Sequence, residues 1–291
     1  MKILVLGANG MLGHKIVQVL KDKFEVFGTI LGSFADIEGY GIFERSKILE
    51  NIDAASVEAI SGAVDAIKPD YLINCVGIIK QKPTASNVAE TIRINSLLPH
   101  ELAEIAERTD AKLITISTDC VFDGVFGMYS EDDLPNARDL YGKSKHLGEV
   151  TYGKHLTIRT SIIGRELNTS HSLIEWFLSN EGGLVKGFSN AVYTGFPTIV
   201  FADIICDLIT NQPELSGVFH ISSDPINKHD LLQLVKSHFG IEIEILKDET
   251  FRIDRSLDSS RFREITGFVP KTWDEMIRIM ANDSLPYSNW R

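Results

Sequence analysis

The sequence predicts an α/β protein whose larger part is a doubly wound parallel sheet and whose smaller part is a C-terminal lobe. Short apolar runs alternate with segments of helical spacing through the first half of the chain. A strand followed by a helix and another strand packs as a parallel pair with a crossover helix. The second half is less regular, which indicates that the two parts differ in architecture.

The periodicity of apolar residues places the individual elements. Strands are expected at Lys2–Leu6, Glu25–Thr29, Tyr71–Cys75, Lys112–Ser117 and Leu156–Arg159. Helices are expected between them at Met11–Lys21, Ala54–Ile67, Asn87–Thr109 and Tyr141–Tyr152. In the second half the patterns predict helices at Ser172–Leu178, Val200–Thr210, Lys228–Phe239 and Thr272–Ala281, and strands at Gly217–Ile221 and Ile241–Leu246.

A glycine-rich turn follows the first strand, with Gly7, Gly10 and Gly13 spaced three apart. In a dinucleotide-binding turn one glycine makes the bend, another lets the backbone approach a pyrophosphate, and a third lets helix and strand pack closely. The next helix then offers free N–H groups and a positive dipole end to the phosphates. The pattern predicts a Rossmann nucleotide site, with an ordinary βα turn as the alternative. The remaining contact residues of this turn are Asn9, Met11 and Leu12.

A tyrosine and a lysine four residues apart are the candidate catalytic pair. Tyr141 and Lys145 share one face if a helix begins at Tyr141. The ammonium would lower the pKa of the phenol, which could then exchange a proton with a carbonyl or alcohol oxygen. Thr118, at the end of an apolar run, is the third candidate. A solvated helix pair and a threonine that caps a turn are the alternatives.

Taken together, the sequence resembles the extended short-chain dehydrogenase/reductase superfamily and, within it, the dTDP-4-dehydrorhamnose reductase family. The glycine turn and Tyr-x-x-x-Lys are shared by the whole superfamily, whereas Ser-Thr-Asp ahead of Val-Phe-Asp-Gly is fairly specific to that family. The resemblance covers most of the chain and rests on residues 7–13, 74–77, 93–95, 117–124, 141–145 and 159–161.

The resemblance implies a domain organisation and a set of roles. A dinucleotide-binding domain is expected at 1–165, to which 198–222 returns, and a mainly substrate-binding lobe at 166–291. Tyr141 would protonate a ketone oxygen that Thr118 orients, and Lys145 would also bind the nicotinamide ribose. Asn95 is expected to support the site. Further dinucleotide contacts are expected from Asp53, Val76 and Gly77, and substrate contacts from Thr118, Asp119, Cys120, Arg165, Arg255 and Arg261.

The segment after the second strand bears on the choice of cofactor. An NAD enzyme carries a carboxylate about 20 residues past the glycines, where it binds the ribose 2′-OH. The segment from Gly28 to Ser33 has no acid there, and no arginine that could bind a 2′-phosphate. The missing acid favours NADP(H), with NAD(H) possible, and Asp36 is the acid that could still reach the ribose.

Composition excludes several classes of function. The formal charge of -11 argues against nucleic-acid binding, and it requires local positive groups to hold an anionic substrate. The three cysteines have no metal-ligand spacing, so no metal is expected. No apolar run has the length of a membrane helix, and the first residues already form a strand. A cytoplasmic protein without a membrane partner is expected, with a homodimer possible.

The leading interpretation is an NAD(P)H-dependent reductase of a nucleotide-linked 4-keto-6-deoxy sugar. The alternatives are a sugar-nucleotide epimerase of the same superfamily and a non-catalytic regulatory subunit, because the resembled family includes a regulatory partner of methionine adenosyltransferase. The chain departs from the family pattern around the sugar. Ile162 and its neighbours replace a tryptophan and an aromatic turn, and Cys120 stands where a tyrosine is usual. The identity of the sugar and of the nucleotide therefore does not follow.

Overall fold

The computed structural model describes residues 1–79, 87–167 and 169–290, except for the side chains of 288 and 289. The chain divides into two compact units. Unit 1 comprises 1–117, 138–158 and 202–218, and unit 2 comprises 118–137, 159–201 and 219–291. Within the expected range 1–165, the segments 118–137 and 159–165 belong to unit 2, and the segment that returns to unit 1 is 202–218.

Unit 1 is built on a seven-stranded sheet with the order β10-β6-β5-β4-β1-β2-β3. Its register is parallel from β6 through β3 and aligns Leu4 with Leu72 and Phe27. Because the carboxyl ends of parallel strands meet at one edge, the loops after β1 and β4 are brought together there with the end of β5. The strands are β1 (Lys2–Leu6), β2 (Glu25–Thr29), β3 (Ile48–Leu49), β4 (Tyr71–Asn74), β5 (Lys112–Ile116), β6 (Leu156–Arg159) and β10 (Gly217–His220).

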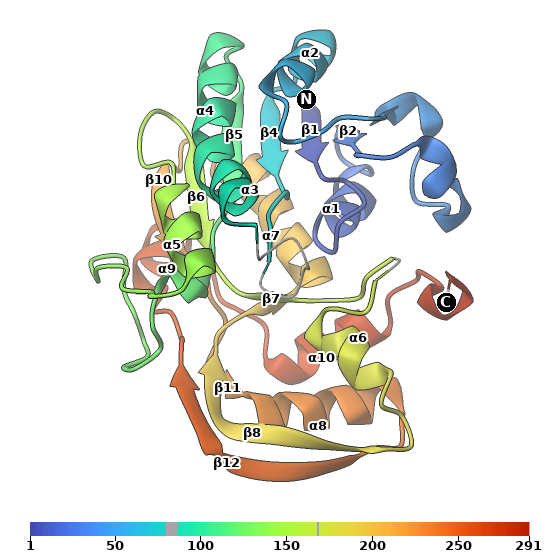
Figure 1. The fold of residues 1–291 in the computed structure, drawn as a ribbon, viewed down its shortest axis with the longest axis vertical. Coiled ribbons are helices and arrows are strands. Elements are labelled where there is room, and N and C mark those ends of the chain that lie inside the picture. Colours follow the sequence, from blue (N-terminus) through green and yellow to red (C-terminus); the bar gives the residue numbers. More distant parts are fainter. Residues whose placement is uncertain (80–86, 168, 291) are drawn as a thin grey trace. The chain divides into compact units, whose positions relative to one another are not determined.

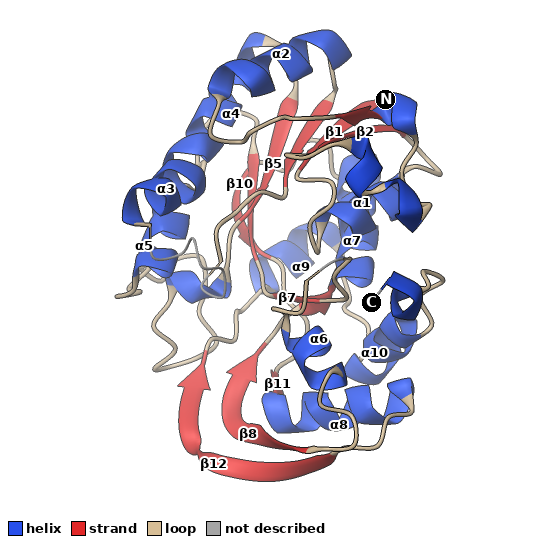
Figure 2. Cartoon of the chain, turned by 45° about the vertical axis from the view of Figure 1, so that its right-hand side comes forward, coloured by secondary structure: helices blue, strands red, loops and turns tan. Residues whose placement is uncertain are grey.

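Helices cover both faces of this sheet (Figure 2), as a doubly wound fold requires. The main apolar core packs β1, β4 and β5 against α2 and α4, with Leu4, Leu72, Leu98 and Leu102 fully buried. The expected fold class, a doubly wound parallel sheet, is confirmed. The helices concerned are α1 (Gly13–Leu20), α2 (Val57–Ile67), α3 (Val88–Ile92), α4 (Leu98–Arg108), α5 (Leu140–Leu147) and α7 (Thr198–Asn211).

The helix expected at Asn87–Thr109 contains a π-helical turn, Arg93–Leu97, between α3 and α4. Pro99 stands at the start of α4. A proline has no N–H, so the carbonyl of Asn95 loses its usual partner four residues on. A wider turn accommodates this loss, and such turns are frequent at functional sites.

Unit 2 contains a three-stranded sheet with the order β11-β8-β12, in which β8 pairs antiparallel with β11 and parallel with β12. Figure 1 shows α8 lying along β8. A short parallel pair joins β7 (Ile162–Ile163) to β9 (Phe196–Pro197). The remaining elements are β8 (Leu184–Tyr193), β11 (Ile226–Asn227), β12 (Glu244–Asp254), α6 (Leu173–Leu178), α8 (Lys228–Phe239), α9 (Ser260–Thr266) and α10 (Trp273–Ala281).

The sheet of unit 2 differs from the sequence-based expectation. β8 was not expected, and β12 runs to Asp254 although a strand was expected only at Ile241–Leu246. Both strands carry many polar residues and are largely exposed on one face. Their stability comes from the long pairing between them and from the packing of α8, neither of which is visible in local propensity. The short helix α9 was likewise not expected.

Candidate active site

The turn after β1 has the geometry of a phosphate-binding loop. Gly7 has a φ of 74°, a conformation that favours glycine. A Cβ on Gly13 would lie 2.1 Å from the carbonyl oxygen of Gly7, so the start of α1 is packed directly on the bend. α1 has no side-chain cap and no acidic residue in its first turn. No local carboxylate therefore binds the first N–H groups of this helix in place of a phosphate.

The loop after β4 lies against this turn. A Cβ on Gly7 would come within 3.0 Å of the Val76 side chain. The amide of Asn74 stabilises the loop, because its oxygen accepts from the N–H of Val76 at 3.0 Å. Val76 therefore lies beside the bend where it was expected to contact the dinucleotide. Asp53 accepts from the N–H of Ala55 at 2.8 Å, which makes it the first residue of a turn ahead of α2.

The segment after β2 folds back on itself. The carboxylate of Asp36 accepts from the N–H of Ser33 at 2.8 Å and from its hydroxyl at 3.1 Å. A Cβ on Gly32 would lie 2.5 Å from the same carboxylate. The carboxylate of Asp36 is thus held against the segment 28–33, which has no acidic residue of its own.

Tyr141 and Lys145 lie one turn apart on α5. Asp139 caps this helix by accepting from the N–H of Gly142 at 3.0 Å, which fixes the turn that contains Tyr141. Lys145 is 8% exposed, and its ammonium donates to the carbonyl oxygen of Ile116 at 2.6 Å. The lysine is therefore anchored at the carboxyl end of β5.

Burial lowers the pKa of Lys145 to about 8, although the nearby Glu149 carboxylate opposes this shift. Glu149 is itself buried and accepts from the hydroxyl of Ser117 at 2.7 Å. The ring of His146 lies 2.9 Å from its other oxygen. The charge on Lys145 thus depends on a buried carboxylate that the sequence pattern did not single out.

Asn95 joins α5 to the loop after β4. Its amide oxygen accepts from the N–H of Ile78 and its amide nitrogen donates to the carbonyl of Ile78, both at 2.9 Å. The same nitrogen lies 3.2 Å from the hydroxyl of Ser144. A Cβ on Gly148 would lie 2.0 Å from the Asn95 carbonyl oxygen, so α5 packs directly on the π-helical turn. Asn95 is a structural bridge within unit 1, as its expected supporting role requires.

Thr118, Asp119 and Cys120 begin unit 2, and they are described with that unit. The hydroxyl of Thr118 donates to Asp119 at 3.0 Å and accepts from the N–H of Cys120 at 3.1 Å. Asp119 is 6% exposed, and burial raises the pKa of its carboxyl, against the effects of Thr118 and of the Arg255 guanidinium. Thr118 therefore caps a turn that holds a buried carboxyl group.

The three predicted arginines have different environments. Arg255 is half-buried, and its Nε donates to the carbonyl of Phe122 at 3.0 Å. Arg261 is exposed and stacks over the ring of Phe219 at 4.6 Å. Arg165 pairs with the fully buried carboxylate of Glu175 at 2.8 Å and stacks on Tyr287. Arg165 therefore already serves unit 2 as the partner of a buried charge.

Sequence reasoning missed two residues of unit 2. Tyr193 lies on β8, and Lys228 begins α8 directly after Asn227, which pairs with Val192 next to Tyr193. Burial raises the pKa of Tyr193 well above its usual range, and the Asp119 carboxylate adds to this effect. Burial lowers the pKa of Lys228, while Asp119 and Cys120 oppose this shift. Neither residue belongs to a motif, and the strand that holds Tyr193 was not expected, so no sequence pattern pointed to them.

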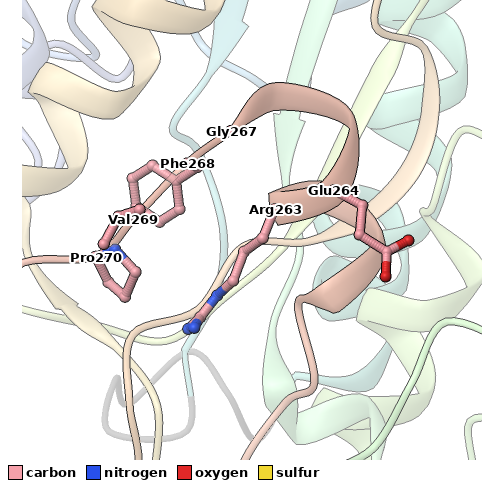
Figure 3. Close-up of a pocket in the computed structure, with 6 residues that line it drawn as sticks. All are labelled: Arg263, Glu264, Gly267, Phe268, Val269 and Pro270. Atoms are coloured by element: carbon pink, nitrogen blue, oxygen red, sulfur yellow. The ribbon is translucent and has the colours of Figure 1, made fainter.

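A pocket elsewhere on unit 2 lies at the end of α9 (Figure 3). Arg263 borders it, but its guanidinium is engaged by Ser259 and by the carbonyl of Ser222. The pocket is lined by Arg263, Glu264, Gly267, Phe268, Val269 and Pro270. None of these is a site residue predicted from the sequence.

Two other features are absent from the described residues, a cluster of metal ligands and a membrane-spanning helix. Within 1–79, 87–167 and 169–290, no group of three or more histidine, cysteine, aspartate or glutamate side chains could hold a metal ion. Over the same described residues, no helix has both the length and the apolar character needed to cross a membrane.

The chain is similar to proteins of known family. The model of the RmlD substrate binding domain family matches residues 1–285. The spore coat polysaccharide biosynthesis protein SpsK of Bacillus subtilis is 25% identical over 95% of both chains. The methionine adenosyltransferase 2 subunit beta of Xenopus tropicalis is 32% identical, over 95% of this chain and 80% of that protein.

Solved structures show the same fold. A hypothetical dTDP-4-dehydrorhamnose reductase from Sulfolobus tokodaii superposes with a TM-score of 0.77 at 26% identity, covering 94% of this chain and 98% of that one. The dTDP-4-dehydrorhamnose reductase of Bacillus anthracis, solved in complex with NADP, gives a TM-score of 0.78 at 19% identity, covering 96% and 98%.

Proposed function

The chain belongs to the RmlD substrate binding domain family, and on that premise we propose that it is an NAD(P)H-dependent reductase of a nucleotide-linked 4-keto-6-deoxy sugar. The observation that supports this most is the pair on α5. Tyr141 lies one turn from a buried Lys145 whose ammonium is anchored to the end of β5. Burial of a charged group is costly, so the buried position of Lys145 beside Tyr141 supports a functional role for the pair.

The glycine turn of unit 1 fits a dinucleotide. The bend at Gly7 and the contact of Gly13 with its carbonyl leave no room for a side chain, so backbone N–H groups line the turn. Gly7, Asn9, Gly10, Met11, Leu12 and Gly13 would hold the pyrophosphate, with Val76, Gly77 and Asp53 as further contacts. The bound nicotinamide supplies the hydride for the reduction. The lack of a carboxylate between Gly28 and Ser33 supports NADPH as the preferred form.

Tyr141 would act as the proton donor to the ketone oxygen. An unperturbed phenol with a pKa near ~10 is a weak acid at neutral pH, so a neighbouring cation is useful. Lys145 provides that cation, and its fixed position also suits a hydrogen bond to the nicotinamide ribose. Thr118 would orient the same carbonyl.

Residues of unit 2 would hold the substrate. Asp119 and Cys120 follow Thr118 in one short turn, and Arg255 is close enough to influence the Asp119 carboxyl group. Arg261 is exposed and available for a phosphate. The phosphate contact expected of Arg165 is not part of this proposal, because its guanidinium is paired with the buried Glu175.

A regulatory role is the second candidate, and a specific similarity favours it. The methionine adenosyltransferase 2 subunit beta is the relative with 32% identity. The presence of Thr118, Tyr141 and Lys145 supports catalysis, since a purely regulatory subunit does not require all three. An epimerase would keep the same residues but would hold its cofactor tightly through the reaction.

The test is a turnover assay on the purified protein. Nucleotide-linked 4-keto-6-deoxy sugars carrying dTDP, UDP or GDP would be supplied with NADPH or NADH while absorbance at the nicotinamide band is followed. Stoichiometric loss of the reduced cofactor with formation of the 4-hydroxy sugar is expected. Interconversion of sugar epimers without net cofactor consumption would instead indicate an epimerase. Absence of turnover on every sugar would favour the regulatory alternative.

A further inference from the structure

Three side chains of unit 2, those of Tyr193, Lys228 and Arg255, carry donor groups near Asp119 that have no acceptor among the described residues. The hydroxyl of Tyr193 is buried and has no hydrogen-bond partner. Within the described part of the chain, no hydrogen bond or ion pair involves the Lys228 ammonium, and the Arg255 guanidinium uses only its Nε. Tyr193 is buried, whereas Lys228 and Arg255 are half-buried, and an unpaired buried donor such as the Tyr193 hydroxyl is rare in folded proteins.

The small sheet of unit 2 brings these residues together. β8 runs between β11 and β12, and its Val192 is paired with Asn227 on one side and Asp254 on the other. Lys228 follows Asn227 directly, and Arg255 follows Asp254 and donates its N–H to the carbonyl of Val192 at 3.1 Å. The residue after Val192 is Tyr193. Tyr193, Lys228 and Arg255 therefore all lie near Val192, although they come from three separate segments.

The hydroxyl of Tyr193 has no acceptor in the part of the folded protein that the structure describes. Its side chain is 8% exposed, and its ring packs against Trp273 with centroids 5.4 Å apart. A Cβ on Gly195 would lie 2.8 Å from the same ring, so the ring packs closely on this glycine. Burial and the Asp119 charge raise its pKa, so the phenol stays protonated at neutral pH and keeps its O–H. A fixed neutral phenol is suited to donate to a ligand oxygen.

The local charge favours an anion. The charged groups facing this point are the ammonium of Lys228, the guanidinium of Arg255 and the carboxyl of Asp119. Asp119 already accepts from the hydroxyl of Thr118 at 3.0 Å. Two cations against one buried carboxyl leave an excess of positive charge in a chain whose formal charge is -11. Such a site can attract a phosphate that the rest of the surface repels.

We propose that Tyr193, Lys228 and Arg255 together bind the phosphate oxygens of the nucleotide-linked substrate. This inference rests on the proposed function for the identity of the ligand, but its chemistry requires only a nucleoside diphosphate. The ammonium and guanidinium supply charge-assisted hydrogen bonds, and the phenol supplies a neutral one. The phosphate oxygens would accept hydrogen bonds from the Tyr193 hydroxyl, the Lys228 ammonium and the terminal nitrogens of Arg255.

Tyr193→Phe gives the first test. The variant keeps the ring and its packing on Trp273 and removes only the unpaired O–H. The affinity for dTDP and UDP, measured by titration calorimetry, is expected to fall about tenfold, as for the loss of one hydrogen bond to a charged group. The melting temperature should stay unchanged or rise, since an unsatisfied buried group is removed. A lower melting temperature with unchanged affinity would show a structural role and overturn the proposal.

Lys228→Met gives the second test, with Lys247→Met as its control. Lys247 is an exposed lysine of β12 that pairs with Glu249, so its replacement makes the same change in net charge. Lys228→Met is expected to weaken binding of dTDP and UDP by about 10–100-fold, whereas Lys247→Met should change it less than twofold. Binding of thymidine and uridine, which lack phosphates, should be the same in all variants. Equal effects of the two lysine variants would contradict a specific site.

The outcomes separate this inference from the proposed function. If the wild type binds dTDP or UDP and the two variants weaken that binding, the phosphate site stands even if no ketosugar is reduced. If ketosugars are reduced and Lys228→Met leaves both the KM and the diphosphate affinity unchanged, the reductase proposal stands and the phosphate site fails. Failure of the wild type to bind any nucleoside diphosphate would overturn the phosphate site directly.

Discussion

Two lysines, the buried Lys145 of unit 1 and the half-buried Lys228 of unit 2, show how differently the two parts of this protein prepare a site. Lys145 of unit 1 has an internal partner, because its ammonium donates to the carbonyl of Ile116. Lys228 of unit 2 has no hydrogen bond or ion pair within the described residues, and its nearest charges are Asp119 and Arg255. In both cases burial lowers the pKa of the lysine.

The difference indicates two ways in which a protein can position a lysine ammonium group for a functional role. In unit 1 the position of Lys145 is fixed before any ligand arrives, since a strand end and a capped helix define it. A catalytic group gains from such preorganisation, because no reorganisation is then required during the reaction. In unit 2 the buried Tyr193 hydroxyl is unsatisfied and the Lys228 ammonium has no partner among the described residues, so a bound ligand could supply these hydrogen bonds. The predictions below test this contrast, in order of decreasing effect.

The largest effect is expected from Tyr141→Phe, which tests whether the fixed pair of unit 1 is catalytic. The ring and helix are retained while the acid is lost, so turnover of a ketosugar should fall by ~10²–10⁴. Dinucleotide affinity, followed by nicotinamide fluorescence, should change less than about threefold. Turnover equal to that of the wild type would remove the proposed mechanism.

The next largest effect is expected from Gly13→Ala, which tests whether the glycine turn is a close-packed cradle. The new methyl would lie 2.1 Å from the Gly7 carbonyl oxygen, so the turn must open. We expect NADPH affinity to fall by ~10² and the free energy of unfolding to fall by about 1–3 kcal/mol.

Gly62→Ala is the matched control for that variant. Gly62 lies inside α2, and a Cβ there would meet nothing within 4 Å. The same change should therefore raise the free energy of unfolding by about 0.5–1 kcal/mol and leave NADPH affinity unchanged. Equal behaviour of the two variants in chemical denaturation would show that the turn is not specially packed.

Asn95→Ala tests how far the preorganisation of α5 depends on the π-helical turn. The variant removes two hydrogen bonds to Ile78 and one to Ser144, and leaves their groups unpaired in a buried place. The free energy of unfolding should fall by about 2–3 kcal/mol. If Asn95 only supports the site, turnover at a temperature well below unfolding should fall less than tenfold. A larger loss with intact stability would assign Asn95 a direct part in the reaction.

The last prediction concerns pH, and near neutral pH its effect is small. Because the pKa of Lys145 is about 8, its ammonium is charged below that pH and loses its proton above it. Affinity for NADPH should be constant below about pH 7 and fall by up to about tenfold per unit above pH 8. Lys145→Met should show weak binding without this dependence.

Protein stability should change in the opposite direction over the same range. The unfolded lysine titrates near ~10.4 and therefore binds more protons than the folded one between about pH 8 and 10. The contribution of Lys145 to the free energy of unfolding thus rises with pH in that window. A loss of NADPH affinity that tracked a loss of stability would therefore contradict the assignment to Lys145.

Much of unit 1 could be predicted from the sequence, because local patterns determine it. β1, β2 and β6 have the bounds that their apolar runs predict. The glycine turn could be located for the same reason, since a bend with a positive φ at Gly7 requires glycine. The π-helical turn at Arg93–Leu97 was missed, although Pro99 is a local cause that a closer reading of the chain could have used.

Unit 2 was predicted less well, because its elements depend on partners distant in the sequence. β8 and β12 stabilise each other across about 60 residues of chain and show little alternation of apolar and polar residues. Arg165 was expected to be available to a phosphate, and nothing in the sequence indicates that Glu175 lies fully buried against it. Pairings of this kind arise from tertiary packing.

The sequence by itself determined the fold class, the dinucleotide turn and the position of the Tyr141–Lys145 pair. These features follow from the spacing of residues along one strand or one helix, which local geometry sets. The tertiary structure decided which charged groups already have partners. Whether the donor of a lysine, an arginine or a tyrosine has a hydrogen-bond partner depends on segments distant in the sequence. Glu175 supplies a partner for Arg165, whereas no described residue supplies one for the Tyr193 hydroxyl.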